Sequence, residues 1–536
     1  MRLFWVSLVL AGLLAVFVLP WPIGRLATGL PDSTSDPLSF VWILERMSQN
    51  LLGARALYDG NILFPFKESL ATSETLPACA LLYGAYKWIF GQSLLAFNLL
   101  QLTFLAANFL SMYFFSRLFL RTGGALVAAT IFGFSLVRLA HLQHFHLMPQ
   151  FLFPVFWGCA WKYERDRRGK WLVAMGALAG LQLYFSLSLG IVLGLSALPY
   201  AGFLLWRGRT GGFVPVVVGA LVFVVVSAGI GASYYRISQQ YGFRRPISDA
   251  YGSSANLGSW FLVTSDHLYD PPLGDLIIGG NGGRGREENV LFVGFAVLFL
   301  AYVGFKRLRR CRSAYGKRIS KLLLYSLLFS VVLAFGTNLG VYNLLYYTLP
   351  GLKGFRTPAR MGLSYLFFMA VLAGIGFQVL QSRLRSGAGA RAVLGLIGLA
   401  LIFVLDTHRP LVYPEVGANL NGVTEWLRAQ GDDGAVVHLP FDVTALETLR
   451  MFKSLEHGRP IANGYTGFKP PSYGEVRQAA AGYARAGGAE KKALLLQLGF
   501  RYLVVNLDRL PSGERAYLDA LAAALVSDGF AVYRLE

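Results

Sequence analysis

Long apolar runs separated by short polar segments fill the first 406 residues of the chain. A transmembrane helix needs roughly 20 mainly apolar residues, and about eleven runs approach that length. The candidate spans are residues 3–21, 93–116, 123–140, 147–161, 171–187, 189–206, 213–233, 289–305, 322–336, 358–380 and 392–406. This pattern predicts a polytopic α-helical membrane protein.

The run from 171 to 206 has two interpretations, because it can form two spans or one long kinked helix. Short loops rich in Lys and Arg stay on the cytoplasmic side of a membrane. With the N-terminus in the cytoplasm and two spans here, every basic cluster falls on that side, including Arg207, Arg209 and the dense run 306–321. We therefore prefer two spans, and one span stays open as the alternative.

This orientation places five regions on the periplasmic or extracellular side: a first outward loop at 22–92, the short turn HLQHFH at 141–146, a loop at 234–288, the turn at 353–360 and everything after 406. Within the first loop, residues 37–52 are amphipathic and begin with proline. Residues 76–91 are short and rich in aromatic residues and Lys. Both patterns are typical of helices at the membrane interface.

The pattern changes after about residue 410, where the apolar runs become shorter. Strand-like segments at 435–441, 501–507 and 530–536 alternate with helical patterns at 421–430, 488–498 and 514–527. This alternation predicts a small soluble α/β domain. We expect a transmembrane domain over 1–406 and an outward α/β domain over 407–536.

Composition supports the membrane interpretation, since 55% of the residues are hydrophobic and only 15% are charged. The formal charge of +20 does not indicate nucleic-acid binding, because the basic residues lie in short loops between apolar runs. The three cysteines are far apart and indicate neither a disulfide framework nor a metal cluster.

Two carboxylates, Asp32 and Asp36, lie in the segment PDSTSDP where the chain first meets water outside the membrane. A carboxylate at the edge of an apolar cavity is partly desolvated, so its pKa rises and it becomes a plausible general base. The alternative is structural, since Asp before Pro is an ordinary turn former and helix N-cap.

Other outward polar residues are candidate substrate ligands: Glu74, His141, His144, Lys353, Arg356 and Arg360. Arg356 and Arg360 flank Pro358 at a predicted helix start, which suits an anionic headgroup, although both can also be interfacial anchors. The spacing H-x2-H-x-H is not a recognised zinc pattern. We assign no metal ligand, and a divalent cation stays possible.

Several of these segments resemble the GT-C superfamily of integral-membrane glycosyltransferases, in particular a poorly characterised bacterial subset. The similar segments are DPLSFVWILER, LYDGNILFPF and SETL in the first loop, then RLAHLQHFHL, the segment from Glu288 to Gly294, FRTPAR and NGYTGFKPPSY. They follow one another along nearly the whole chain.

The resemblance implies an enzyme of the bacterial inner membrane that takes a sugar from a polyprenyl-phosphate or polyprenyl-diphosphate carrier. It would transfer the sugar, with inversion, to a glycan, lipid or protein acceptor on the outer face. An acid of the first outward loop would serve as base or metal ligand, and Asp36 matches it better than Asp32. Arg356 and Arg360 would hold the phosphate.

Two other functions stay open. A transporter or flippase of lipid-linked saccharides would need ionisable residues at mid-membrane depth; of the carboxylates, Asp406 at the edge of the last span comes nearest. A non-catalytic envelope assembly protein would act through its C-terminal domain, where Trp426, Tyr465, Phe468 and Tyr473 either stack on glycans or form the core.

Overall fold

A computed structural model describes residues 23–32, 35–206, 213–270, 286–349, 351–384, 389–409, 411–417 and 419–536. The candidate span at 3–21 and the basic residues Arg207 and Arg209 lie outside these ranges. The chain forms two compact units. The helical unit contains residues 101–238 and 244–411, and the mixed unit contains residues 23–100, 239–243 and 412–536.

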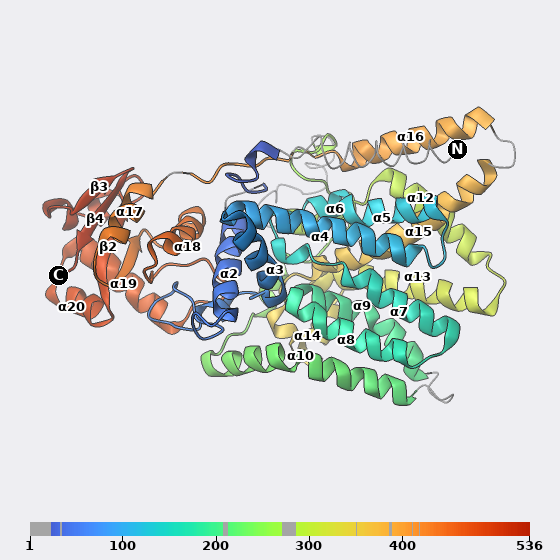
Figure 1. Cartoon of the computed structure of the whole chain (residues 1–536), viewed down its shortest axis with the longest axis horizontal. Coiled ribbons are helices and arrows are strands. Elements are labelled where there is room, and N and C mark those ends of the chain that lie inside the picture. Colours follow the sequence, from blue (N-terminus) through green and yellow to red (C-terminus); the bar gives the residue numbers. More distant parts are fainter. Residues whose placement is uncertain are drawn as a thin grey trace. The chain divides into compact units, whose positions relative to one another are not determined.

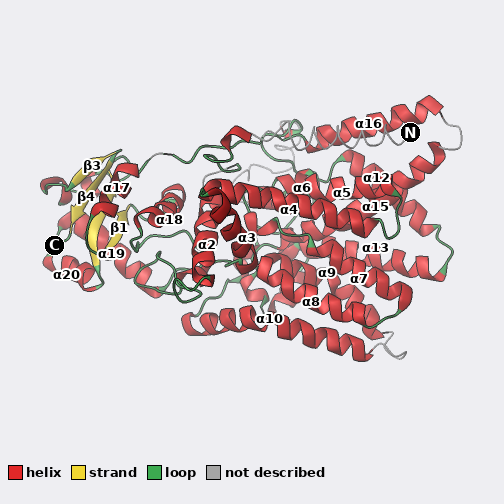
Figure 2. Ribbon diagram, viewed as in Figure 1, coloured by secondary structure: helices red, strands yellow, loops and turns green. Residues whose placement is uncertain are grey.

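The described residues of the helical unit form helices joined by loops and short turns (Figures 1 and 2). The helices are α5 Thr122–Phe134, α6 Leu136–Leu139, α7 Leu152–Asp166, α8 Lys170–Phe185, α9 Leu187–Trp206, α10 Phe213–Tyr241, α12 Phe295–Arg309, α13 Ala314–Ala334, α14 Val341–Thr348, α15 Gly362–Leu384 and α16 Gly389–Thr407, together with most of α4 Ser93–Ser116. Every candidate span within the described residues corresponds to a helix or a pair of successive helices. The predicted helical membrane fold is therefore confirmed.

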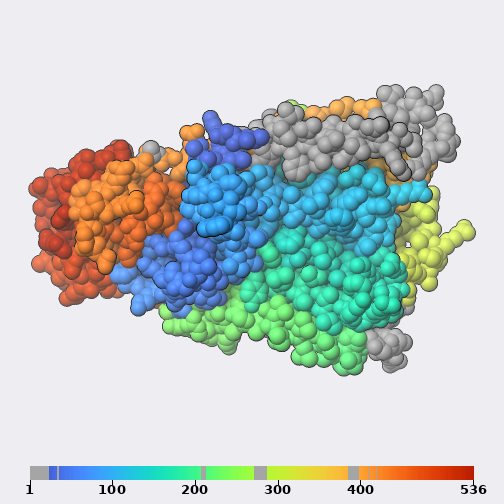
Figure 3. Space-filling view, viewed as in Figure 1, coloured from blue at the N-terminus to red at the C-terminus, as the bar shows by residue number. Residues whose placement is uncertain are grey.

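Five helical segments of the described chain are long and apolar enough to cross a membrane by length and composition. These are Ser93–Ser116, Thr122–Leu139, Leu187–Trp206, Phe213–Tyr241 and Pro358–Arg383. The total of about eleven spans stays a prediction. Along one edge of the helical unit, α10 leaves most of its apolar side chains exposed (Figure 3), as expected of a helix that faces lipid.

Residues 171–206 form two helices, as the preferred interpretation predicts. Ser186 separates α8 from α9 because its backbone is extended, with φ −168° and ψ 127°. The two helices then pack against each other. Their sidedness in the membrane stays a prediction.

Glycines let α15 lie close to α12, and α15 also packs against α5. A Cβ on Gly376 would lie 1.9 Å from the Leu300 carbonyl oxygen, and a Cβ on Gly304 would lie 2.1 Å from that of Leu372. Larger residues would separate the two helices, so close backbone packing fixes α15 and the turn that precedes it.

The mixed unit combines helices with a four-stranded sheet in the order β1-β2-β4-β3. Strand β1 Ala435–Leu439 runs parallel to β2 Phe500–Asn506, whereas β4 Phe530–Arg534 is antiparallel to β2 and to β3 Leu525–Ser527. The helices are α2 Asp36–Leu51, α3 Pro77–Phe90, α17 Asn421–Ala429, α18 Thr444–His457, α19 Pro471–Ala486 and α20 Ala489–Gln497. The predicted C-terminal α/β region is confirmed, and α18 and α19 are additions that the sequence pattern did not indicate.

The helix predicted at 514–527 is wrong. This segment contains only short 3-10 turns and ends in β3, which pairs with β4. Asp528 and Gly529 connect the two strands with φ of 53° and 76°, the left-handed geometry of a tight hairpin turn. The alanine-rich pattern favours a helix locally, but pairing with β4 decides the structure.

A segment of the first outward loop extends this sheet. Residues 460–463 bond to β1 at Val436, and their other side bonds to residues 61–64. The Ile461 N–H donates to the Asn61 carbonyl at 2.8 Å, and the Phe64 N–H donates to the Ile461 carbonyl at 3.0 Å. The predicted division at 406 therefore differs from the structure, since the first loop belongs to the same unit as the C-terminal residues. Backbone pairing between such distant segments leaves no local sequence pattern.

Helix α2 is buried from Pro37 to Ser48 and packs against both α3 and α18. The Asn61 side chain connects them: its oxygen accepts hydrogen bonds from Trp42 and Arg46, and its nitrogen donates to the carbonyls of Ser454 and Arg459. The amphipathic pattern at 37–52 thus belongs to a helix inside the mixed unit. The position of α2 relative to the membrane stays a prediction.

Candidate functional site

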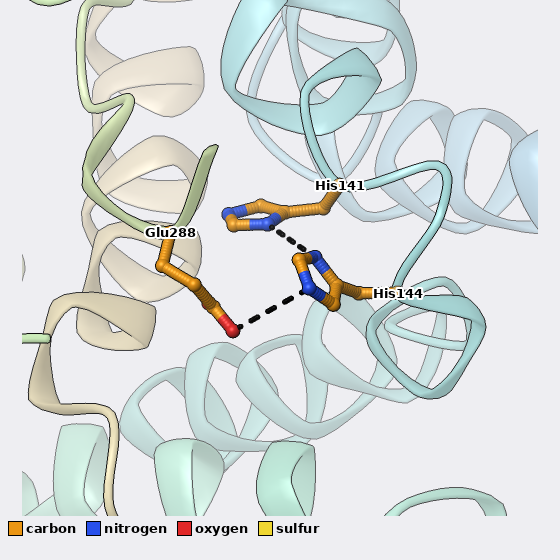
Figure 4. A group of neighbouring side chains, drawn as sticks. All are labelled: His141, His144 and Glu288. Atoms are coloured by element: carbon orange, nitrogen blue, oxygen red, sulfur yellow. Dashed lines mark hydrogen bonds and ion pairs between the residues drawn. The ribbon is translucent and has the colours of Figure 1, made fainter. Parts of the chain in front are cut away.

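A buried polar cluster lies in the helical unit where three distant segments meet. Figure 4 shows three of its members, His141, His144 and Glu288. Residues 139–150, which we call the histidine turn, supply His141 and His144. Glu288 lies in the 3-10 turn Glu287–Asn289, and Arg360 lies in the 3-10 turn Pro358–Met361 that leads into α15. The cluster therefore depends on contacts between residues far apart in the sequence.

Arg360 and Glu288 form a bidentate ion pair. The Arg360 Nη2 lies 2.5 Å from Glu288 Oε1, and its Nε donates to Oε2 at 3.1 Å. The remaining Nη1 donates to the Ser188 hydroxyl of α9 at 3.1 Å. A bidentate, charge-assisted pair of this kind fixes the orientation of both side chains.

The two histidines extend this pair. His144 Nε2 lies 3.7 Å from Glu288 Oε1, and the Nδ1 atoms of His141 and His144 lie 3.5 Å apart. His141 is buried, whereas His144 keeps part of its surface exposed. The cluster thus runs in one line from a buried guanidinium through a carboxylate to two imidazoles.

Burial and charge set the protonation of the cluster. Burial raises the pKa of Glu288, but Arg360 and His144 outweigh it and hold that pKa well below its usual range. Burial lowers the pKa of His141 to about 3, against a smaller opposing effect of Glu288. At neutral pH the carboxylate is therefore ionised and His141 is neutral.

The cluster has the chemistry of a metal-ligand group. Ligand atoms of His141, His144 and Glu288 all lie within 4.8 Å of one another. Two imidazoles and one carboxylate suit Zn²⁺ or a similar transition metal, which leaves a further position for water or substrate. Both carboxylate oxygens of Glu288 bond to Arg360, however, so a metal ion here would lie beside a buried cation.

The structure brings together three of the predicted substrate ligands, His141, His144 and Arg360, and places the other two basic ones elsewhere. Lys353 is exposed and lies in the 3-10 turn Leu352–Gly354, and Arg356 is also exposed. The two arginines predicted to hold one phosphate therefore differ. Arg360 already bonds to Glu288, whereas the Arg356 side chain is exposed.

The predicted acids of the first loop belong to the mixed unit. Asp36 is the first residue of α2, where a negative charge is favourable at the helix N-terminus, and its carbonyl accepts the Ser39 hydroxyl at 2.7 Å. Asp32 has a left-handed backbone, with φ 63°, and its N–H donates to the Val412 carbonyl at 2.8 Å. Glu74 is half-buried.

Glu288 is the member of the cluster that sequence reasoning did not select. It is the first residue of the segment ENVLFVG, and an acid that directly precedes an apolar span is a useful signal. Its partner Arg360 lies 72 positions further along the chain. Only the fold shows that the two residues form a pair.

Asp406 has a structural role. Its carboxylate accepts the Ala296 N–H at 2.9 Å and the Tyr269 hydroxyl at 3.3 Å, so it caps the first turn of α12. Gly294 makes room for it, because a Cβ there would lie 2.7 Å from Asp406 Oδ2. The carboxylate that comes nearest to the transporter interpretation therefore serves a helix N-terminus.

No protein-family model matches the chain, and no curated protein matches it either. Solved structures do match. The oligosaccharyltransferase of Archaeoglobus fulgidus is 15% identical with a TM-score of 0.55, over 94% of this chain and 69% of that one. ArnT from Cupriavidus metallidurans bound to undecaprenyl phosphate is 12% identical with a TM-score of 0.50, over 99% of this chain and 98% of that one. The chain has the GT-C fold.

A third GT-C structure, the arabinofuranosyltransferase AftD from Mycobacteria, is 14% identical with a TM-score of 0.55. The match covers 95% of this chain but only 35% of AftD. The resemblance inferred from short sequence segments is thus confirmed at the level of the fold. It extends over both units of the chain, since each match covers nearly all of it.

Proposed function

We propose that the chain is a membrane glycosyltransferase that moves a sugar from a polyprenyl-phosphate or polyprenyl-diphosphate carrier to an envelope acceptor on the outer face of the bacterial inner membrane. The observation that carries the proposal is a buried, charged cluster inside a GT-C fold. An ionised Glu288–Arg360 pair is costly to bury in an apolar helical unit, and such residues usually mark a functional site.

The reaction would be an inverting displacement. The oxygen of an acceptor hydroxyl forms a bond to the anomeric carbon, and the bond from that carbon to the carrier phosphate breaks. The proton of the hydroxyl passes to a base, and the phosphate leaves with the electron pair. We assign Asp36 as the base and Asp32 as the second candidate, because both lie in the first outward loop.

The leaving phosphate gains negative charge, so cations nearby would speed the reaction. The exposed Lys353 and Arg356 suit this role, whereas Arg360 acts through Glu288 and keeps it beside His144. His141, His144 and Glu288 would hold a divalent cation if one takes part, and such an ion would neutralise the phosphate. Glu74 is assigned to orienting substrates.

The test measures sugar transfer and carrier binding separately in lipid nanodiscs. We expect Asp36→Asn to lower transfer from a panel of synthetic polyprenyl-phosphate sugars by about a hundredfold or more, as the loss of a general base does. Binding of undecaprenyl phosphate, measured by native mass spectrometry, should not change. The matched control is Asp59→Asn, another acid of the same loop, which should transfer as wild type does.

Unchanged transfer in Asp36→Asn would remove the base assignment, and loss confined to Asp32→Asn would move it to the second candidate. Vesicles distinguish transfer from transport. If a labelled carrier crosses the bilayer without any covalent change while no sugar product forms, the chain is a transporter and the proposed reaction is wrong.

A further inference from the structure

Buried side chains from outside the histidine turn hold its backbone. Five donors each bond to a different carbonyl of the turn. Gln101 bonds to Leu142 at 2.6 Å, Asn108 to Met148 at 2.8 Å, Arg138 to Leu147 at 2.8 Å, Gln182 to Pro149 at 3.1 Å and Arg409 to Leu139 at 2.5 Å. They come from α4, α6, α8 and the residues after α16, so the turn is tied to four separate parts of the helical unit.

Three of these donors are side-chain amides, and burying them in this way destabilises the folded protein. Gln101, Asn108 and Gln182 are all fully buried, and the side-chain oxygen of each has no hydrogen-bond partner among the described residues. A buried acceptor without a donor is unfavourable. Rotating any of these amides would not help, because its oxygen would then face a carbonyl oxygen.

The Leu142 carbonyl lies in the backbone between His141 and His144, and its bond comes from Gln101. The Met148 and Pro149 carbonyls lie on the far side of His144, and their side-chain bonds come from Asn108 and Gln182. The amides therefore fix the backbone on both sides of His144. Side chains that act in catalysis must be held to within about half an ångström, and such support from a second layer of residues provides it.

We propose that Gln101, Asn108 and Gln182 are positioning residues that hold His141 and His144 in place before substrate binds. The proposal deepens the proposed function and rests on it for the catalytic consequence. The competing explanation is that the amides merely satisfy carbonyls in an apolar environment, where every backbone group needs a partner. The two explanations predict different responses of the histidines.

The experiment compares Gln101→Leu with Asn98→Leu in nanodiscs. Asn98 is a buried amide of the same helix, but its nitrogen donates to the carbonyls of Leu26 and Gly29 in the mixed unit. Carbethoxylation of individual histidines by diethyl pyrocarbonate is followed by mass spectrometry. We expect Gln101→Leu to speed modification of His141 and His144 about tenfold through local opening.

The internal reference is His438, which is buried in the mixed unit and should react at the wild-type rate in both variants. In a transfer assay, kcat of Gln101→Leu should fall about tenfold while KM for the carrier stays within about twofold. Equal modification of His141 and His144 in Asn98→Leu, or a parallel rise at His438, would show a purely structural effect and overturn the proposal.

Opening of the turn without any change in kcat would also overturn the positioning role, although the chain would still be a transferase. If the wild-type chain transfers no sugar at all, the proposed function fails. The modification experiment would then still report whether the amides hold the turn.

Discussion

Each unit buries a glutamate–arginine pair, and the two pairs differ in how they are held. In the mixed unit, Glu447 and Arg450 lie one turn apart on α18, with side chains 2% and 0% exposed. In the helical unit, Glu288 and Arg360 come from distant segments, with side chains 11% and 10% exposed. Local spacing creates the first pair, and the fold creates the second.

Their surroundings differ as well. Glu447 accepts bonds from Arg450, from the Asn463 amide and from the backbone N–H groups of Asp442 and Gly464, and Arg450 donates to the carbonyls of Leu439 and Pro440. Those contacts tie the end of β1 to α18. Glu288 instead lies beside His144, which has part of its surface exposed. We infer that the first pair holds the unit together and the second serves chemistry.

The largest expected effect is on stability, in the mixed unit. Glu447→Ala leaves the fully buried Arg450 guanidinium without a carboxylate, which costs about 3–5 kcal/mol. Thermal unfolding of the detergent-solubilised protein should show a lower midpoint. The control is Glu425→Ala on the exposed face of α17, which should change stability by less than about 0.5 kcal/mol. Equal midpoints in both variants would contradict a structural role for the pair.

The second prediction concerns the helical unit, where we expect a loss of activity that is larger than the loss of stability. Glu288→Gln keeps an acceptor for Arg360 but removes the negative charge beside His144, so we expect sugar transfer to fall about a hundredfold. The unfolding midpoint should shift less than in Glu447→Ala. A large loss of stability with normal transfer per folded molecule would mean that both pairs are structural.

Local patterns predicted most of the helical unit and less of the mixed unit. The span predicted at 93–116 has the bounds of α4, because a long apolar run can only satisfy its backbone within itself. The helix predicted at 514–527 fails, since β4 provides external partners that outweigh local propensity. Asp528-Gly529 was the available signal for that hairpin.

The candidate site also contains residues that the sequence predicts and one that only the fold reveals. His141, His144 and Arg360 were predicted because their residue types and outward position suggested chemistry. Glu288 was missed as a ligand since its role comes from a contact that no spacing reveals. The backbone pairing of residues 61–64 with residues 461–463 also has no signal in the sequence. This pairing decides which unit the first loop joins.

The third prediction uses pH to compare the buried histidines of the mixed unit with His408, an exposed histidine of the helical unit. Burial, with help from Arg459 and Arg46, lowers the pKa of His457 to about 3. The unfolded chain binds this proton near pH 6.5, so stability is present above that pH and is lost as the pH falls toward 3. Between pH 7 and pH 5 the loss is about 2 kcal/mol.

His457→Gln should therefore be less sensitive to acid than wild type, measured as the fall in unfolding midpoint between pH 7 and pH 5. His438 also has a pKa well below its usual range and should keep part of the sensitivity. His408→Gln, at an exposed position, should match wild type. An unchanged fall in the His457 variant would mean that this imidazole takes up its proton in the folded chain.

The smallest expected effect concerns metal binding, which only the pair of the helical unit allows. His141, His144 and Glu288 are suitable Zn²⁺ ligands, but the Arg360 guanidinium opposes a second cation beside it. Residues that support metal ligands usually strengthen binding, and their loss weakens it by about 10–100-fold. Here repulsion between the two cations should be the larger contribution, because both charges lie in a buried environment.

Arg360→Gln should consequently bind Zn²⁺ at least about tenfold more tightly than wild type, and His144→Gln in the same background should remove the gain. Competition with a fluorescent zinc indicator measures both affinities, and chelation should return each variant to its metal-free state. Weaker Zn²⁺ binding in Arg360→Gln would show that the guanidinium supports Glu288 as a ligand. The pair would then differ from Glu447–Arg450 by admitting a metal ion that its own arginine helps to hold.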